Sequence, residues 1–441
     1  MQETQEVKGS GPSPGPSDIE RQVVRKVSRR LIPFMFILYV IAYLDRVNVG
    51  FAALQMNADL NFSAAVYGLG SGIFFIGYFL FEVPSNLILE RTGARIWIAR
   101  IMITWGIVSS ATAFIQGPRS FYLVRFLLGL AEAGFFPGMI LYLTYWFPAA
   151  HRAKTVAFFM TATAVSGVIS GPVSGALLTM HGFGGLAGWQ WLFLIEGLPA
   201  VLLGVVVLFY LTDRPEKAKW LSDNEKNWLV ARLHEEQVRR EHHGMVKFIQ
   251  AVRSGRVWML CLIYLSVVIG LYGVGFWMPL LIKGASGLSD FMVGIVSVFP
   301  YLLAAAGMTI IGMHSDKTGE HRIHAAFAIL LAAAGMLFTA YSSTPAMELA
   351  CLSLVAIGIW GTLGPFWAFA TSFLSGSAAS GGIALINSIG NLGGFFGPYL
   401  VGIIRDMTGG FKYGLIVLAV ILFLGFLVAL LLKQDPSGDT G

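Results

Sequence analysis

Residues 413–432 read Y-G-L-I-V-L-A-V-I-L-F-L-G-F-L-V-A-L-L-L, twenty residues without a charge between Lys412 and Lys433. A helix of about 20 apolar residues spans the ~30 Å hydrocarbon core of a bilayer. Comparable runs recur along the whole chain. They predict twelve membrane-spanning helices, at 31–53, 65–89, 96–116, 120–146, 155–180, 190–211, 257–282, 291–313, 323–342, 346–372, 380–404 and 411–432.

The composition of the chain excludes a soluble protein. Of its 441 residues, 56% are hydrophobic and 12% are charged, whereas about a quarter of the residues in a soluble protein are charged. A soluble chain of this size could not enclose so large an apolar core. Cys261 and Cys351 both fall within predicted spans, where they are expected to pack as small apolar residues. We expect no metal site and no cofactor other than protons.

Charge outside the spans predicts the orientation of the chain. Twelve crossings place both termini on one side, and loops rich in Lys and Arg stay cytoplasmic. Six such residues lie in 1–30 and ten lie in 212–256, whereas the opposite side has only Arg119, Lys283, Arg405 and Lys412. Both termini are therefore predicted to be cytoplasmic, in a multi-pass protein of the inner membrane. The net charge of +6 then reports orientation and not binding to nucleic acid.

A repeat divides the spans into two related halves. Glu90-Arg91-Thr92-Gly93 follows the second span, and Asp316-Lys317-Thr318-Gly319 follows the eighth at an offset of 226. The same offset relates Gly171-Pro172 to Gly397-Pro398. We therefore expect an all-α membrane protein of two six-helix bundles with parallel pseudo-symmetry. Its predicted parts are a tail at 1–30 (disordered to residue 20, then basic), a bundle at 31–211, a cytoplasmic loop at 212–256, a bundle at 257–433 and a tail at 434–441.

The two loops of the repeat resemble the signature loop of the major facilitator superfamily, G-x-x-x-D-[RK]-x-G-[RK]. The second copy, I-G-M-H-S-D-K-T-G-E (311–320), fits well, and the first has Glu90 in place of Asp. The resemblance implies a latch in which the acid caps a neighbouring helix and the base pairs across the bundles. The expected latch residues are Glu90, Arg91, Asp316 and Lys317.

Other motifs resemble the anion:cation symporter branch of that superfamily, whose members carry sugar acids, tartrate, phthalate and related anions. These motifs are Y-L-D-R-V-N (43–48), E-V-P-S-N (82–86), V-R-F-L-L-G-L-A-E-A-G-F-F-P-G (124–138) and L-Y-L-T-Y-W-F-P (141–148). The resemblance extends from about residue 25 to 432 and is strongest to bacterial tartrate-type and aromatic-acid permeases.

Six ionisable residues lie within the spans, namely Asp45, Arg46, Glu82, Arg125, Glu132 and Glu196. Each costs roughly 3 kcal/mol to insert near a helix centre, so each needs a partner or a wet cavity. Glu82 and Glu196 lie beside Pro or Gly, and we expect them to bond backbone groups. The other four form either a functional site or salt bridges that only hold helices together.

Spacing supports the functional interpretation of these four residues. Arg125 and Glu132, seven residues apart, share one face of a helix, whereas the adjacent Asp45 and Arg46 point about 100° apart. Guanidinium groups suit a carboxylate, and a carboxyl in an apolar bundle can take up a proton. The family resemblance implies that Asp45 and Glu132 couple to protons and that Arg46 and Arg125 bind substrate. Protonation of the acids would free the arginines for the anion.

Further candidates for substrate contacts rest on less specific sequence signals. Tyr43 and Tyr78 resemble family positions that bond substrate hydroxyls, and Trp367 and Thr371 follow a bendable Gly- and Pro-containing stretch. Asn387 and Asn391, four residues apart, share a helix face. Core packing, or polar contacts between helices, is an equally good explanation for these four residues on the tenth and eleventh spans.

The sequence therefore predicts a monomeric proton-coupled symporter that imports a small organic anion, such as a tartrate-like hydroxy acid or a sugar acid, by alternating access. Two alternatives remain within the superfamily, an aromatic carboxylate permease and an exporting antiporter. A receptor or scaffold that moves nothing would not need protonatable acids at membrane depth. An enzyme is disfavoured because no nucleophile–base pair, metal cluster or phosphate-binding loop is present in the sequence.

Overall fold

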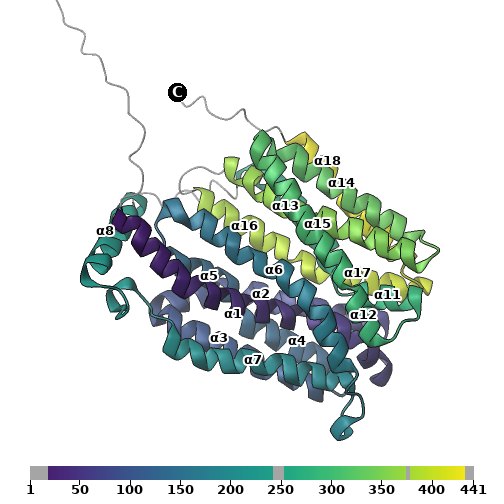
Figure 1. The fold of residues 1–441 in the computed structure, drawn as a ribbon. Coiled ribbons are helices and arrows are strands. Elements are labelled where there is room, and N and C mark those ends of the chain that lie inside the picture. The colour runs from purple at the N-terminus through teal and green to yellow at the C-terminus, as the bar shows by residue number, and fades with distance from the viewer. Residues whose placement is uncertain (1–17, 242–252, 374–377, 433–441) are drawn as a thin grey trace, which may run out of the picture.

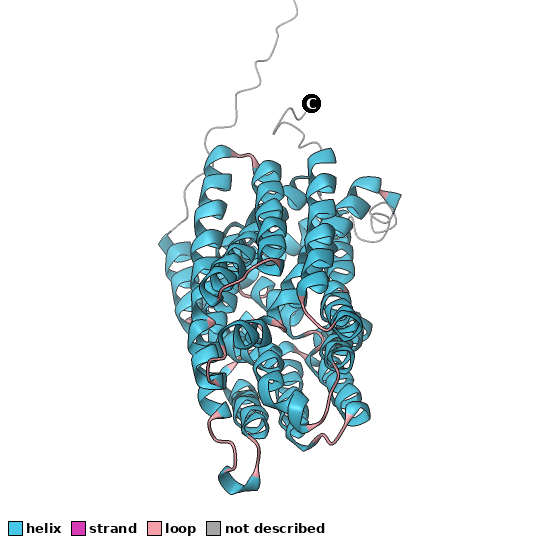
Figure 2. Cartoon of the chain, turned by 90° about the vertical axis from the view of Figure 1, so that its right-hand side faces the viewer, coloured by secondary structure: helices cyan, strands magenta, loops and turns pink. Residues whose placement is uncertain are grey.

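A computed structural model describes residues 18–241, 253–373 and 378–432, and all regular elements in these ranges are helices (Figures 1 and 2). Outside the described residues lie residues 1–17 of the predicted tail at 1–30, residues 242–252 of the predicted loop, residues 374–377, Lys433 and the predicted tail at 434–441. The α-helices are α1 (Asp18–Asp59), α2 (Ala64–Thr92), α3 (Ala94–Ala111), α4 (Pro118–Glu132), α5 (Phe135–Thr144), α6 (Ala149–Leu178), α7 (Gly188–Tyr210), α8 (Asp223–Glu241), α10 (Gly255–Gly275), α11 (Met278–Ser286), α12 (Asp290–Val296), α13 (Val298–Thr318), α14 (His321–Ala340), α15 (Pro345–Phe373), α16 (Ala378–Asn391), α17 (Gly393–Thr408) and α18 (Lys412–Leu431).

The helices confirm the predicted all-α membrane fold. Eleven helical segments of the described residues are long and apolar enough to cross a membrane. The remaining predicted span, 380–404, coincides with α16 and α17, of 14 and 16 residues, which follow one another across Leu392. Pro398 lies inside α17, where its missing N–H weakens the helical ladder.

The predicted fourth span at 120–146 is present as one candidate crossing, Pro118–Thr144, but its helix is interrupted between α4 and α5. Gly134 adopts a left-handed conformation with φ of 87°, which ends the helical path directly after Glu132. A Cβ at this position would lie 2.2 Å from Ser85 Oγ, so the close approach of α2 also requires glycine. The seventh and eighth spans are likewise divided, between α10 and α11 and at Ser297 between α12 and α13.

The basic lead-in at 21–30 is not a separate element. It lies in the first part of α1, a helix of 42 residues that begins at Asp18 and continues into the membrane span. The central loop contributes α8, which packs beside the start of α1: Gln22 Nε2 and Lys26 Nζ donate to the Glu225 carboxylate at 3.3 and 2.7 Å. Figure 1 shows α8 at one end of the molecule and α11 and α12 at the other.

The two bundles contact each other at glycines that are related by the offset of the repeat. A Cβ on Gly68 of α2 would lie 2.5 Å from the carbonyl oxygen of Pro398 on α17. In the other half, a Cβ on Gly294 of α12 would lie 2.2 Å from the carbonyl oxygen of Gly171 on α6, next to Pro172. Gly68 and Gly294, and likewise Pro172 and Pro398, are 226 positions apart. The repeat offset is therefore reproduced in space as parallel pseudo-symmetry.

Polar contacts join the bundles at this same end, which lies away from α8. The backbone N–H groups of Ala64 and Ala65, at the N-terminus of α2, donate to the Asp406 carboxylate at 2.9 and 2.8 Å. Gln55 Nε2 donates to Asp290 at 2.9 Å, and the Tyr67 hydroxyl donates to the carbonyl of Phe276 at 2.9 Å. A carboxylate suits the positive end of a helix dipole. The two bundles are thus fastened together at the end opposite the central loop.

Candidate substrate and proton site

Close helix packing places the charged residues of α4 against α2. A Cβ on Gly129 of α4 would lie 2.0 Å from the carbonyl oxygen of Phe74, and one on Gly77 of α2 would lie 2.4 Å from that of Phe126. Only glycine at both positions allows the two backbones to approach so closely. Arg125 and Glu132, on the same face of α4, are thereby held beside Phe74 and its neighbours on α2.

Arg46 and Glu132 form an ion pair between α1 and α4. Arg46 Nη2 donates to Glu132 Oε1, and the two side chains are 13% and 0% exposed. Each partner keeps unused capacity, since Arg46 Nε and Glu132 Oε2 have no hydrogen-bond partner among the described residues. The pair joins α1 to α4 within the first bundle, and removing one partner would leave the other charge buried without compensation.

Arg125 is buried and has few hydrogen-bond partners among the described residues. Its side chain is 0% exposed, and its only hydrogen bond to a described residue runs from Nη2 to the Ser71 carbonyl at 3.3 Å. Nε and Nη1 have no partner among the described residues. Each buried polar atom left unpaired costs about 1–3 kcal/mol, and more when charged. This guanidinium therefore retains the capacity to bind an anion through two N–H groups.

The two arginines converge on one aromatic ring. Arg46 Cζ lies 5.6 Å and Arg125 Cζ lies 5.1 Å from the centroid of Phe74, and Arg46 is also 5.6 Å from that of Tyr78. Cation–π attraction at these distances offsets part of the cost of burying the charges. Phe74 was absent from the predicted site, because one aromatic residue among several on a span carries no distinguishing signal.

Asp45 does not share the partner of Arg46, as the angle of about 100° between neighbouring helical residues predicts. Its carboxylate accepts hydrogen bonds from Trp105 Nε1 at 2.8 Å, from Ser109 Oγ, and from Asn48 Nδ2 at 3.3 Å. Trp105 and Ser109 belong to α3, so Asp45 joins α1 to α3 inside the first bundle. Arg46 faces Glu132 instead. The structure thus brings Arg46, Arg125 and Glu132 together. Asp45 has a different set of hydrogen-bond partners, but its charge still acts on Arg125 and Glu132.

The expectation that Glu82 and Glu196 bond backbone groups is wrong, since side chains supply their donors. Asn387 Nδ2 on α16 donates to Glu82 Oε1 at 3.3 Å, which links the two bundles at membrane depth. Ser174 Oγ donates to Glu196 Oε1 at 2.8 Å. Backbone amides inside an intact helix are already bonded, so buried carboxylates must find donors on neighbouring helices.

The remaining residues that were predicted to contact the substrate lie in different surroundings. Tyr43 is buried, and Asn391 is half-buried at the end of α16. Trp367 packs edge-on against Tyr264 at 5.1 Å, a core contact. The Thr371 hydroxyl donates to its own helix, to the carbonyl oxygens of Trp367 and Ala368 at 2.8 and 3.0 Å. Its hydroxyl oxygen can still accept a bond.

The predicted latch residues Glu90, Arg91, Asp316 and Lys317 are exposed, and no hydrogen bond or ion pair joins their side chains to another described residue. Other acids hold the helix N-termini that follow them. Asp213 Oδ1 accepts from the backbone N–H of Arg95 near the start of α3 at 2.9 Å, and Glu320 caps α14 through Ile323 N at 3.1 Å. In this conformation the predicted latch is therefore not engaged.

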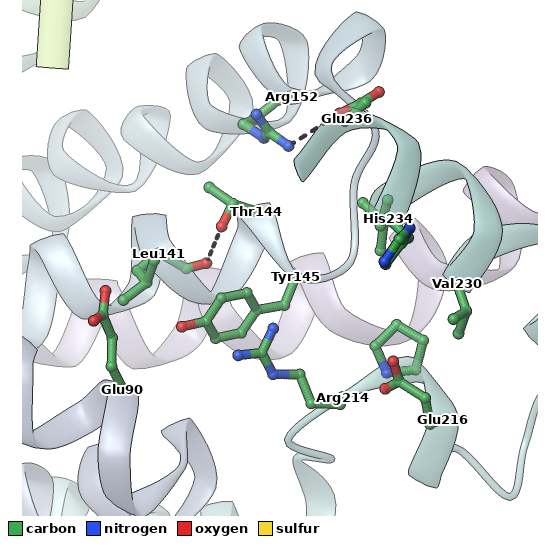
Figure 3. A pocket seen from close by; sticks show the side chains of 12 residues that line it. Glu90, Leu141, Thr144, Tyr145, Arg152, Arg214, Glu216, Val230, His234 and Glu236 are labelled. Atoms are coloured by element: carbon green, nitrogen blue, oxygen red, sulfur yellow. Dashed lines mark hydrogen bonds and ion pairs between the residues drawn. The ribbon is translucent and has the colours of Figure 1, made fainter. Parts of the chain in front are cut away.

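Glu90 instead lines a cavity of about 430 Å³ among the ends of α2, α5, α6 and α8 (Figure 3). Arg214 Cζ lies 3.6 Å from the centroid of Tyr145, and Arg152 pairs with Glu236 at 3.6 Å. Acids and bases are mixed in this lining. None of the intramembrane charges described above contributes to it, so the cavity is separate from the candidate site.

The chain has relatives along nearly its whole length. It is 55% identical to a protein of Agrobacterium vitis named "Putative tartrate transporter", over 96% of this chain and 98% of that protein. It is 44% identical to the "Quinolone resistance transporter" of Acinetobacter baumannii, covering 93% and 95% of the two chains. It is 40% identical to the "Inner membrane transport protein RhmT" of Escherichia coli, covering 94% and 96%.

Among solved structures, a bacterial homologue of the human lysosomal transporter Spinster has the same fold, with a TM-score of 0.75 at 18% identity over 91% of this chain and 96% of that chain. Residues 35–398 match the family described as Major Facilitator Superfamily. The helices, the repeat and these matches agree that the chain is a multi-pass membrane transporter and not an enzyme. The chain belongs to the major facilitator superfamily.

Proposed function

We propose that this protein is a proton-coupled symporter that imports a small carboxylate, a tartrate-like hydroxy acid or a sugar acid, by alternating access. The observation that carries the proposal is Arg125, a fully buried guanidinium with two unpartnered nitrogens. Guanidinium remains charged when desolvated and offers the planar two-pronged donation that a carboxylate accepts. Arg46, near the same aromatic ring, supplies a second cation to the same anion.

Proton coupling follows from the competition for Arg46. Glu132 occupies one prong of the Arg46 guanidinium. A proton on Glu132 weakens that ion pair and leaves Arg46 available to the substrate, so proton and anion favour each other's binding. If two protons accompany one monoanion, the net positive charge gains about 2.3 kcal/mol per 100 mV of membrane potential. Each proton adds about 1.4 kcal/mol per pH unit of gradient.

Asp45 is proposed as the second proton-coupling residue, acting through α3. Its three hydrogen bonds from described residues come from Trp105, Ser109 and Asn48, and none of these donors is an arginine. A proton on Asp45 would turn one of its oxygens from an acceptor into a donor and so change how α1 packs on α3. Since α1 is one continuous helix, that change reaches Arg46 at the next position.

The remaining candidates complete the proposed cycle. We propose that six further side chains contact the substrate, namely Tyr43, Tyr78, Trp367, Thr371, Asn387 and Asn391. The exposed residues Glu90, Arg91, Asp316 and Lys317 are proposed to form the latch when the loop side closes. With the termini and the central loop cytoplasmic, the fastening at the far end corresponds to an inward-facing conformation. We propose that the protein functions as a monomer in the inner membrane.

Purified protein in liposomes tests the substrate class. Radiolabelled tartrate should accumulate when the outside is more acidic than the lumen, and accumulation should stop with a protonophore. Unlabelled sugar acids and an aromatic acid, each at the same excess, rank the alternatives by competition. Accumulation of none of these acids under an inward pH gradient would contradict the proposal.

A second candidate, an exporting antiporter, is favoured by the name of the Acinetobacter baumannii relative at 44% identity. An antiporter would show the opposite sign in the same vesicles: a proton gradient would drive a quinolone out against the proton flow. Proton-driven accumulation of a carboxylate and an unchanged quinolone distribution would exclude it.

Alternating access predicts a strong effect of one methyl group at the bundle contact. Gly294→Ala places a Cβ 2.2 Å from the Gly171 carbonyl oxygen, where neither backbone can yield easily. Overpacking of this kind costs about 1–3 kcal/mol, so the state closed at this end becomes roughly 5- to 150-fold rarer and the uptake rate falls in proportion. The matched control is Gly284→Ala on α11, whose Cβ meets no atom within 4 Å. Equal uptake rates for the two variants would show that closure at this end does not limit transport.

A further inference from the structure

A basic groove lies outside the transport site, where α1 precedes its membrane span. Arg21, Arg25 and Arg29 are spaced by four residues, so they form one stripe on the helix. Lys26 and Arg30 form the neighbouring stripe. Together with Gln22, Tyr210 at the end of α7, and Trp220, they line a cavity of about 630 Å³, which we call the basic groove.

Among the described residues, an acid pairs with only one of the five cations in the basic groove. Lys26 Nζ pairs with Glu225 at 2.7 Å, and this contact holds the pKa of the Glu225 carboxyl below its usual value. Arg21, Arg25 and Arg29 have no ion pair with a described residue. Arg30 Cζ lies 4.9 and 5.1 Å from the centroids of Tyr210 and Trp220, and its Nε has no partner among the described residues. Four positive charges therefore remain available to a ligand.

The hydrogen-bonding groups that remain free are nearly all donors. Guanidinium and indole N–H groups only donate, and the buried Trp220 Nε1 has no partner among the described residues. The Tyr210 hydroxyl is already used, because it donates to the Arg30 carbonyl at 2.8 Å. A ligand that satisfies this lining must present several acceptors and negative charge, as phosphate oxygens do.

The position of the groove favours a phosphate carried by a lipid over one in solution. Tyr210 is the last residue of a span with a mean hydropathy of 2.5, and Tyr and Trp mark the headgroup level of a bilayer. Phe209, the preceding residue, is 84% exposed and offers an apolar surface beside the groove. Leu31 begins the predicted span directly after Arg30. Acyl chains could thus remain in the membrane while the phosphate reaches the cations.

We propose that the basic groove binds the phosphate of an anionic phospholipid from the leaflet on the side of the chain termini. The site is separate from Arg46, Arg125 and Glu132, so binding of the lipid does not depend on which substrate is carried. The continuous helix α1 joins the groove to Asp45 and Arg46.

Native mass spectrometry of the purified full-length protein with added phosphatidylglycerol or phosphatidylcholine tests the proposal. A cation near an anionic lipid surface contributes roughly fivefold to binding, so Arg25→Gln/Arg29→Gln should weaken phosphatidylglycerol binding about 25-fold. The charge-matched control is Lys217→Gln/Lys219→Gln, two exposed cations outside the groove, and it should bind the lipid as the parent does. Trp220→Phe keeps the aromatic ring and removes one donor, and should show a smaller loss.

Each outcome either supports or overturns the proposal that the basic groove binds an anionic phospholipid. Equal losses in the two double variants would mean that the lipid responds to general surface charge, which would overturn the proposal. Inorganic phosphate or glycerol 3-phosphate displacing phosphatidylglycerol at comparable concentration would identify a site for a soluble anion instead. If both double variants elute as the parent does in size-exclusion chromatography and only the groove variant loses the lipid, the site is assigned.

Discussion

Arg125→Ala is expected to abolish uptake of the proposed carboxylate while leaving the amount of protein in the membrane unchanged. The wild-type guanidinium is 0% exposed and has two free nitrogens, Nε and Nη1. A hydrogen bond to a charged group is worth about 1.5–3 kcal/mol, so losing two of them lowers the affinity at least roughly a hundredfold. Alanine removes a buried charge, which stabilises the variant, and leaves a cavity beside Phe74, which destabilises it, so the change in thermal stability should be small. Initial uptake rates and thermal unfolding of the purified protein measure the two effects.

Two variants sharpen the test of Arg125. Arg125→Lys keeps the charge but cannot donate as a planar fork, so its uptake should also be poor. Arg119→Ala is the matched control, since Arg119 is an exposed arginine on the same helix α4, and it should transport normally. Near-normal uptake by Arg125→Ala would remove Arg125 from the site, and with it the main support for a carboxylate substrate.

Glu132→Gln is expected to separate exchange from accumulation. The amide cannot ionise, so it imitates the protonated acid and leaves Arg46 free of the ion pair that it forms in this structure. The variant should still exchange labelled for unlabelled substrate across a vesicle membrane. Accumulation driven by a pH gradient should fall to the level reached without the gradient, because no proton can be gained or lost at this position.

The matched comparison is Glu82→Gln, which alters a buried carboxylate that hydrogen-bonds Asn387 and forms no ion pair with an arginine of the described residues. This variant should keep its response to the pH gradient. Asp45→Asn should impair driven uptake, and exchange should fail too if Asp45 orients Arg46 through α1. Full pH-driven accumulation by both Glu132→Gln and Asp45→Asn would make these acids structural. The protein would then be a uniporter or would be coupled to another ion.

Local features of the chain were sufficient to predict the fold. Whether a segment crosses a membrane depends on its own length and apolarity, so runs such as 413–432 identify the spans without knowledge of their neighbours. The offset of 226 between the two signature loops was likewise readable. It predicted parallel halves, which the contacts of Gly68 and Gly294 now display in space.

The breaks within spans could not be predicted from these local sequence features. Gly134 and Pro137 were visible in the sequence, yet glycine and proline occur in many spans that remain single helices, among them Pro84 in α2 and Pro172 in α6. The left-handed turn at Gly134 is decided by the approach of Ser85 on a neighbouring helix. A hydropathy window averages over such a turn and cannot detect it.

The candidate site divides in the same way. By itself the sequence determined which ionisable residues lie in the membrane, that Arg125 and Glu132 share a face, and that Asp45 and Arg46 diverge, because helical periodicity fixes these relations within one segment. Only the tertiary structure decided the partners: Glu132 for Arg46, Trp105 and Ser109 for Asp45, and Asn387 for Glu82. These contacts join residues 60 to 305 positions apart. They depend on how helices cross and rotate against one another, which the packing of many side chains sets jointly and no single span encodes.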